Sequence, residues 1–132
     1  MSRKFIFAYL GTLLAFLVLD GLWLGVLMGP TYKSLLGPLM LDQPLLFPAT
    51  LFYLLYVLGC VVLVVLPSAS WQRAARLGAL LGLVAYGTYD LSNWATLHGW
   101  SAGLAVMDMA WGTCLTAACC TVGYLCADRV RD

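Results

Sequence analysis

The sequence predicts an all-α integral membrane protein, with four transmembrane helices in an antiparallel bundle and both termini in the cytoplasm. Hydrophobic residues make up 63% of the 132 positions and charged residues only 10%, and the mean hydropathy is +0.92. A water-soluble chain needs more charge than this to cover its surface. The apolar residues also fall into long runs, each able to cross about 30 Å of hydrocarbon at about 1.5 Å per residue.

The runs lie near residues 5–28, 45–66, 77–97 and 103–127, and together they form a single domain over 1–132. Basic residues orient them. Only Lys33 falls between the first and second runs; the other six precede the first run, separate the second from the third, or follow the fourth: Arg3, Lys4, Arg73, Arg76, Arg129 and Arg131. Lys and Arg accumulate on the cytoplasmic side of membrane proteins. We therefore expect a multi-pass membrane protein with both termini in the cytoplasm.

The longest predicted connection is the outer loop 29–44. It contains Gly29-Pro30, Gly37-Pro38 and Pro44, all of which form turns or interrupt helices. Between them, residues 31–36 are predicted to form a short helix on the membrane surface. This helix would be either an interfacial anchor or a lid over a site that opens outward.

Small residues predict where helices approach closely. Gly21, Gly25 and Gly29 form one small-xxx-small row, and Gly78 and Gly82 form another. Both rows predict close helix packing. The second row also indicates that the inner half of the third helix is tightly packed. A cavity is then expected beside its outer half. The five cysteines lie within the predicted helices, which favours apolar packing over disulfides.

Polar and aromatic residues recur along one face of the third predicted helix. At spacings of i, i+3, i+4, i+7, i+8 and i+11, this face carries Tyr86, Tyr89, Asp90, Asn93, Trp94 and Leu97. Such a stripe inside a membrane helix is costly unless other groups meet it. It therefore predicts polar partners on the neighbouring helices.

Two of those helices carry an Asp followed three residues later by a Trp, in the pairs Asp20–Trp23 and Asp108–Trp111. The acids and Tyr53 map to the outer third of the bilayer, at the depth of the polar stripe. The spans contain no Lys or Arg to neutralise them, and a central Asp costs roughly 2.5–3.5 kcal/mol on insertion scales. The acids thus call for protons, water, a bound cation or a cationic ligand group.

We predict one site, open to the outer side, that draws on all four helices: Asp20, Trp23, Tyr53, Tyr56, Tyr89, Asp90, Asn93, Trp94, Asp108 and Trp111. Low dielectric and mutual repulsion favour neutral acids, so at least one Asp is expected to keep its proton at neutral pH unless a cation binds. No cofactor is predicted, and a metal ion, if any, would be held by Asp20, Asp90 and Asp108. In the alternative interpretation, each Asp accepts a hydrogen bond from an indole or phenol and only locks the bundle.

Four motifs carry a resemblance to a known family: Asp20-x-x-Trp, Phe52-Tyr-x-x-Tyr, Tyr86-Gly-Thr-Tyr-Asp-x-x-Asn and Asp108-x-x-Trp-Gly. With these motifs the chain resembles a family of small bacterial inner-membrane proteins, domain of unknown function 2177, over nearly its whole length. The resemblance implies a four-helix membrane protein of this size. It implies no catalytic role for any residue.

The favoured function is proton- or cation-coupled binding or transport of a small or amphiphilic ligand. Four helices are few for alternating access, so transport would call for a homodimer. One alternative is an intramembrane enzyme that acts on a lipid or isoprenoid, with Asp90 or Asp108 as general acid or base. Another is an accessory or structural subunit whose polar residues face partner helices. The lipid bilayer is the expected partner, whereas the absence of any basic run argues against nucleic acid.

Overall fold

The computed structural model describes residues 2–27, 29–39 and 45–130, and this part of the chain is helical without any strand. Helix α1 (Arg3–Leu22) continues into a π-helical segment η1 (Trp23–Leu27), and α3 (Leu46–Cys60) likewise continues into η3 (Val61–Val65). Between them lie α2 (Gly29–Leu36) and the 3-10 turn η2 (Gly37–Leu39). The chain then forms α4 (Trp71–Thr96) and α5 (Ala102–Asp128). A short helix therefore does form within the predicted outer loop.

Serine side chains set the starts of three helices. Ser2, Ser70 and Ser101 each accept a hydrogen bond from the backbone amide three residues ahead, at the starts of α1, α4 and α5. Helix α4 consequently begins at Trp71, whereas the predicted span begins at 77. The difference arises because hydropathy locates the apolar stretch of a helix and not its N-cap. At its other end the chain reverses through Gly99, whose φ of 83° suits glycine.

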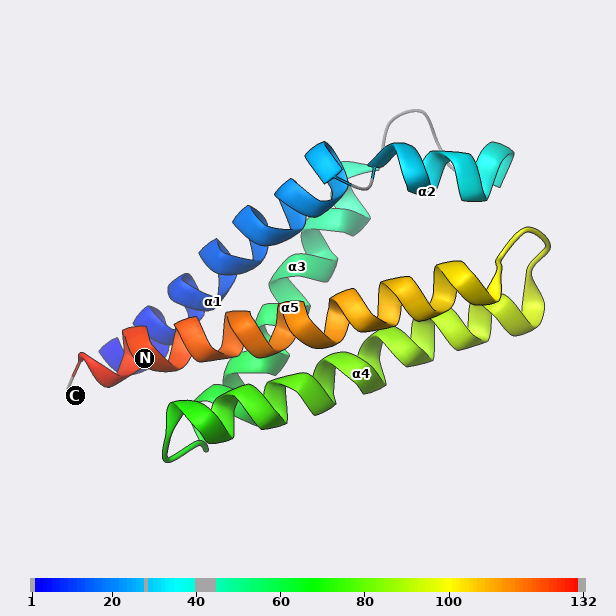
Figure 1. The fold of residues 1–132 in the computed structure, drawn as a ribbon. Helices are drawn as coiled ribbons and strands as arrows, with labels where there is room; N and C mark the ends of the chain where they lie inside the picture. The colour runs from blue at the N-terminus through cyan, green and yellow to red at the C-terminus, as the bar shows by residue number, and fades with distance from the viewer. Residues whose placement is uncertain (1, 28, 40–44, 131–132) are drawn as a thin grey trace.

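The helices diverge from one end of the structure to the other. Figure 1 shows α4 and α5 side by side and running in opposite directions, while α1 packs along α5. Both termini and the α3–α4 turn lie at one end, and the α4–α5 turn and α2 lie at the other. Segment η3 contacts α4 and α5, whereas α3 packs mainly against α1. The space beside α3 therefore widens away from η3.

Glycine allows the backbones of α4 and α5 to approach. A Cβ atom at Gly78 would lie 2.9 Å from the Thr116 carbonyl oxygen, and one at Gly82 would overlap the backbone of α5. On the other side of α5, Gly123 admits the side chain of Thr12 from α1. The close packing predicted for the Gly78–Gly82 row is confirmed.

The same prediction is wrong for Gly21 and Gly25. A Cβ at either position would meet nothing within 4 Å, so this row packs against no described part of the chain. The reason is rotation: α1 buries a different face, formed by residues spaced by four, which are Ala8, Thr12, Phe16 and Asp20. The glycine row lies one step round from that face.

The cysteines behave as the sequence predicts. All five are free thiols, and Cys60, Cys119 and Cys120 are buried in the apolar core with the valines of η3. They act there as small apolar packing residues.

Three segments are long and apolar enough to cross a membrane: Arg3–Gly25, Leu46–Val65 and Ala102–Asp128. Their outward faces are apolar, with Leu14 and Leu55 exposed by 64% and 70%, as expected of side chains in contact with lipid. Helix α4 is not among these segments, because Arg76 near its start and Asp90 near its end shorten its apolar part. The chain is thus a multi-pass membrane protein, and the fourth span stays a prediction.

Candidate functional site

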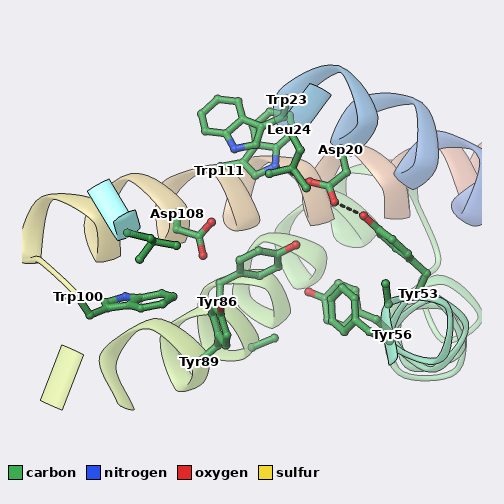
Figure 2. A pocket seen from close by; sticks show the side chains of 14 residues that line it. Asp20, Trp23, Leu24, Tyr53, Tyr56, Tyr86, Tyr89, Trp100, Asp108 and Trp111 are labelled. Atoms are coloured by element: carbon green, nitrogen blue, oxygen red, sulfur yellow. Dashed lines mark hydrogen bonds between the residues drawn. The ribbon is translucent and has the colours of Figure 1, made fainter. Parts of the chain in front are cut away.

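A cavity of about 460 Å³ opens where α3 diverges from α4. Its size falls within the range of about 300–1,000 Å³ that is typical of ligand pockets. Every long helix contributes to its wall, as do α2 and the turn before α5. The lining residues, most of them shown in Figure 2, are Asp20, Trp23, Leu24, Leu36, Ala49, Phe52, Tyr53, Tyr56, Ala85, Tyr86, Tyr89, Trp100, Asp108 and Trp111.

Asp20 anchors one end of the cavity and joins three helices. Its carboxylate is only 7% exposed. Oδ2 accepts a 2.5 Å hydrogen bond from the Tyr53 hydroxyl, drawn in Figure 2, and Oδ1 accepts a 3.2 Å bond from Trp111 Nε1. The ring of Trp23 stacks on that of Trp111, with centroids 4.2 Å apart and planes within 5°. The two Asp-x-x-Trp motifs therefore meet: the acid of one bonds the indole of the other.

Tyrosines form the floor of the cavity. A Cβ at Gly112 would overlap the ring of Tyr86, so this glycine lets the ring pack against α5. The Tyr56 ring meets Tyr86 edge-on at 6.2 Å, and the hydroxyl of Tyr56 shares a 2.8 Å hydrogen bond with Thr116 Oγ1. The glycine that ends Asp108-x-x-Trp-Gly thus has a structural reason, which is room for Tyr86.

The opposite end of the cavity is walled by Trp100, which comes from the turn between α4 and α5. Its ring meets that of Tyr89 edge-on, with centroids 5.4 Å apart and an interplanar angle of 87°. Asp108 reaches the cavity between Trp100 and Tyr86, as Figure 2 shows. Acidic groups therefore lie at two separate places on a largely aromatic wall.

Asp90 lies behind this wall rather than on it. Its side chain is fully buried, at 0% exposure, and does not line the cavity. It neighbours the side chains of Asp108 and Trp100. Neither of its oxygens, nor Trp100 Nε1, has a hydrogen-bond partner among the residues that the structure describes. A buried polar group without a partner is costly, which makes this the least satisfied part of the site.

The structure brings together seven of the ten residues predicted for the site, all lining the cavity: Asp20, Trp23, Tyr53, Tyr56, Tyr89, Asp108 and Trp111. Asp90 is beside them. Asn93 and Trp94 do not line the cavity, and the Trp94 side chain is 47% exposed. Within the described ranges, no three acidic, histidine or cysteine side chains gather as a metal site would require. Asp20, Asp90 and Asp108 therefore do not converge on one point.

Four lining residues are not among the ten that the sequence predicts for the site: Leu36, Phe52, Tyr86 and Trp100. The position of Tyr86 can be predicted from the sequence, because Tyr86 shares the i, i+3 face with Tyr89. Leu36 and Trp100 reach the cavity through the path of α2 and of the α4–α5 turn, which no helical periodicity encodes. Leu36 also shows that α2 covers part of the cavity.

The family model described as "Predicted membrane protein (DUF2177)" matches residues 5–125. No curated protein and no solved structure matches the chain. The matched region contains all fourteen lining residues and the four motifs that position them. Since the match spans almost the entire chain, the protein belongs to the DUF2177 family of predicted membrane proteins.

Proposed function

We propose that this protein binds a small amphiphilic ligand within the membrane and couples its binding or transport to protons or a cation held by carboxyl groups. The observation that carries the proposal is Asp20. This acid is 7% exposed, is oriented by donors from two other helices, and lies on the wall of an aromatic cavity. No Lys or Arg is found among the lining residues in the described part of the chain. The charge of Asp20 therefore has to be balanced by a proton, a cation or the ligand itself.

The membrane topology belongs to the same proposal. Helix α4 runs beside α5, and α4 would be the fourth span of an inner-membrane protein. Of the six basic residues that the structure describes, five lie at the start of α1, in the first turns of α4 or at the end of α5, and these helix ends gather beside the α3–α4 turn. That end would be cytoplasmic by the positive-inside tendency. The cavity would then face the outer side, with α2 at the interface above it.

Asp90 and Asp108 supply the coupling in this proposal. Two neighbouring carboxyl groups in a low-dielectric environment repel each other when both are charged, and a shared proton or bound cation relieves the repulsion. Only Asp108 reaches the cavity, whereas Asp90 lies behind it. A ligand that binds beside Asp108 would alter the balance of charge on the pair and so release or take up a proton.

The burial of Asp90 favours this function over an accessory subunit. A subunit that used its polar stripe to hold partner helices would present that stripe on its surface. Here the carboxyl group of the stripe, Asp90, is fully buried and Tyr86 lines the cavity. The exposed members of the stripe are Tyr89, Trp94 and Leu97. In the alternative of a lipid-modifying enzyme, Asp108 would have to be the general acid or base, since Asp90 does not reach the space where a substrate would bind.

A binding screen tests the proposal. Purified protein in nanodiscs would be titrated with amphiphiles that share a ten-carbon tail and differ in head group: decyltrimethylammonium, decyl sulfate and decanol. We expect at least one to bind the parent and to bind Asp20→Asn at least tenfold more weakly, while Asp128→Asn, at the end of α5, binds like the parent. Proton uptake or release on binding would be followed in weakly buffered solution. The proposal fails if none of the three binds, or if Asp20→Asn binds like the parent.

A further inference from the structure

We infer that the ligand is an amphiphilic organic cation, whose ammonium head lies in the cavity between Asp20 and Asp108 and whose aliphatic tail follows the groove between α3 and α4. This inference rests on the proposed function and names the class of molecule that the site accepts. It is carried by three features: the charge of the wall, its aromatic surface and an apolar groove that adjoins the cavity.

The charge of the cavity selects against anions. Among the lining residues that the structure describes, the ionisable groups other than tyrosines are Asp20 and Asp108, and none is Lys, Arg or His. A phosphate or carboxylate head would be repelled by both acids and would find no cationic partner. A cationic head would balance them. It could do so without breaking the bonds from Tyr53 and Trp111, because each carboxylate oxygen can accept more than one hydrogen bond.

The aromatic surface favours an organic cation over a metal ion. Faces and edges of Trp23, Trp100, Trp111, Tyr86 and Tyr89 surround the space between the acids. A cation within about 6 Å of an aromatic centroid is attracted by the ring, and alkylated ammonium groups are commonly recognised this way. Hard metal ions instead need several oxygen ligands. The described residues offer no cluster of three acidic, histidine or cysteine groups for such an ion.

The tail has a separate place. A second hollow of about 520 Å³, here called the groove, runs along α3 and η3, where Gly59 and Leu63 line it. Leu81 lines it from α4. Phe52 and Tyr56 line both this groove and the cavity, so the two adjoin at these rings. Apart from the Tyr56 hydroxyl, the groove is lined by apolar side chains. A molecule with its head at Asp20 could therefore lay an alkyl chain between α3 and α4.

Head-group selectivity is tested with the same ten-carbon series, using quenching of intrinsic tryptophan fluorescence, since Trp23, Trp100 and Trp111 line the cavity. We expect decyltrimethylammonium to bind at least tenfold more tightly than decyl sulfate or decanol. Asp108→Asn should weaken that binding at least fivefold, and Asp128→Asn should leave it unchanged. Asp108→Asn keeps the test valid should Asp20→Asn fail to fold. Tighter binding of decyl sulfate or decanol would overturn the inference while leaving the proposed function standing; binding of none would overturn both.

The tail is tested by filling the groove. A Cβ at Gly59 meets nothing within 4 Å, so Gly59→Leu should fold and occupy the groove. Gly21→Leu, also in open space but outside the groove, is the matched control. We expect Gly59→Leu to weaken decyltrimethylammonium at least fivefold and to leave tetramethylammonium unaffected, with Gly21→Leu changing neither. Equal decyltrimethylammonium affinities for Gly59→Leu and Gly21→Leu would overturn the placement of the tail.

Discussion

Helices α4 and α5 pack in two different ways along their length. Toward the α3–α4 turn, Gly78 and Gly82 let the two backbones approach directly. Toward the α4–α5 turn, the facing positions hold Tyr86 and Tyr89 on α4 and Trp111 on α5, and a cavity lies beside them. The same pair of helices is thus closely packed at one end and borders a cavity at the other. Residue size accounts for the difference between the two ends. Glycine lets the backbones of two helices touch, whereas large aromatic rings keep α3 away from α4 at the cavity end.

The largest expected effect on stability lies in the glycine-packed end. Gly82→Leu places a side chain against the α5 backbone, which cannot move away without separating the helices. We expect the free energy of unfolding to fall by about 3 kcal/mol, the upper part of the usual range for overpacking. Unfolding in mixed micelles with increasing SDS would measure it. Gly59→Leu, where the added atoms meet open space, should change it by less than about 0.5 kcal/mol. Equal stability of the two variants would show that close backbone contact is not what holds this end together.

A smaller effect is expected from one hydrogen bond in the cavity end. Tyr53→Phe removes the donor to Asp20 Oδ2 and should lower the free energy of unfolding by about 1–3 kcal/mol, because a buried carboxylate oxygen loses its partner. Tyr124→Phe removes the exposed bond from Tyr124 to the Ala69 carbonyl at the other end. We expect it to cost less than Tyr53→Phe and to leave decyltrimethylammonium binding unchanged. A Tyr53→Phe variant as stable as Tyr124→Phe, with unaltered binding, would mean that Asp20 needs no orientation.

The smallest effect is expected at Trp94, which the sequence places on the polar face and the structure leaves 47% exposed. Trp94→Phe should alter decyltrimethylammonium affinity less than twofold. Trp111→Phe, which removes the indole donor to Asp20, should weaken it severalfold. The decyltrimethylammonium affinities of both variants can be measured in one titration series. Similar losses from the two variants would indicate that the end of α4 turns toward the site.

Hydropathy predicts where the long helical segments lie, because apolar runs of this length form helices in a membrane. The depth of the polar groups in the bilayer stays a prediction. The sequence also identifies Asp20, Asp108 and their Trp partners because an acid within an apolar run stands out. It does not determine helix rotation, which depends on packing between distant segments. For this reason the sequence predicts a packed face at Gly21 and Gly25 that the structure shows to be open, and a site position for Trp94, which does not line the cavity.

Chain reversals are the other part that periodicity cannot supply. Trp100 reaches the cavity because the chain turns at Gly99 and is capped at Ser101, and this brings a loop residue back over Tyr89. The pairing of Asp20 with Trp111 likewise depends on α1 lying along α5. Both contacts are set by the tertiary arrangement, although every residue involved is conspicuous in the sequence.

The central claim is that the aromatic cavity holds a cationic head group between Asp20 and Asp108. A structure of the protein in nanodiscs with bound decyltrimethylammonium tests it most directly. The account predicts density for the trimethylammonium group within about 6 Å of the rings of Trp111 and Tyr86, with the alkyl chain running toward Phe52 and Gly59. Density for the head group only at the membrane surface, with the cavity filled by lipid chains, would contradict it.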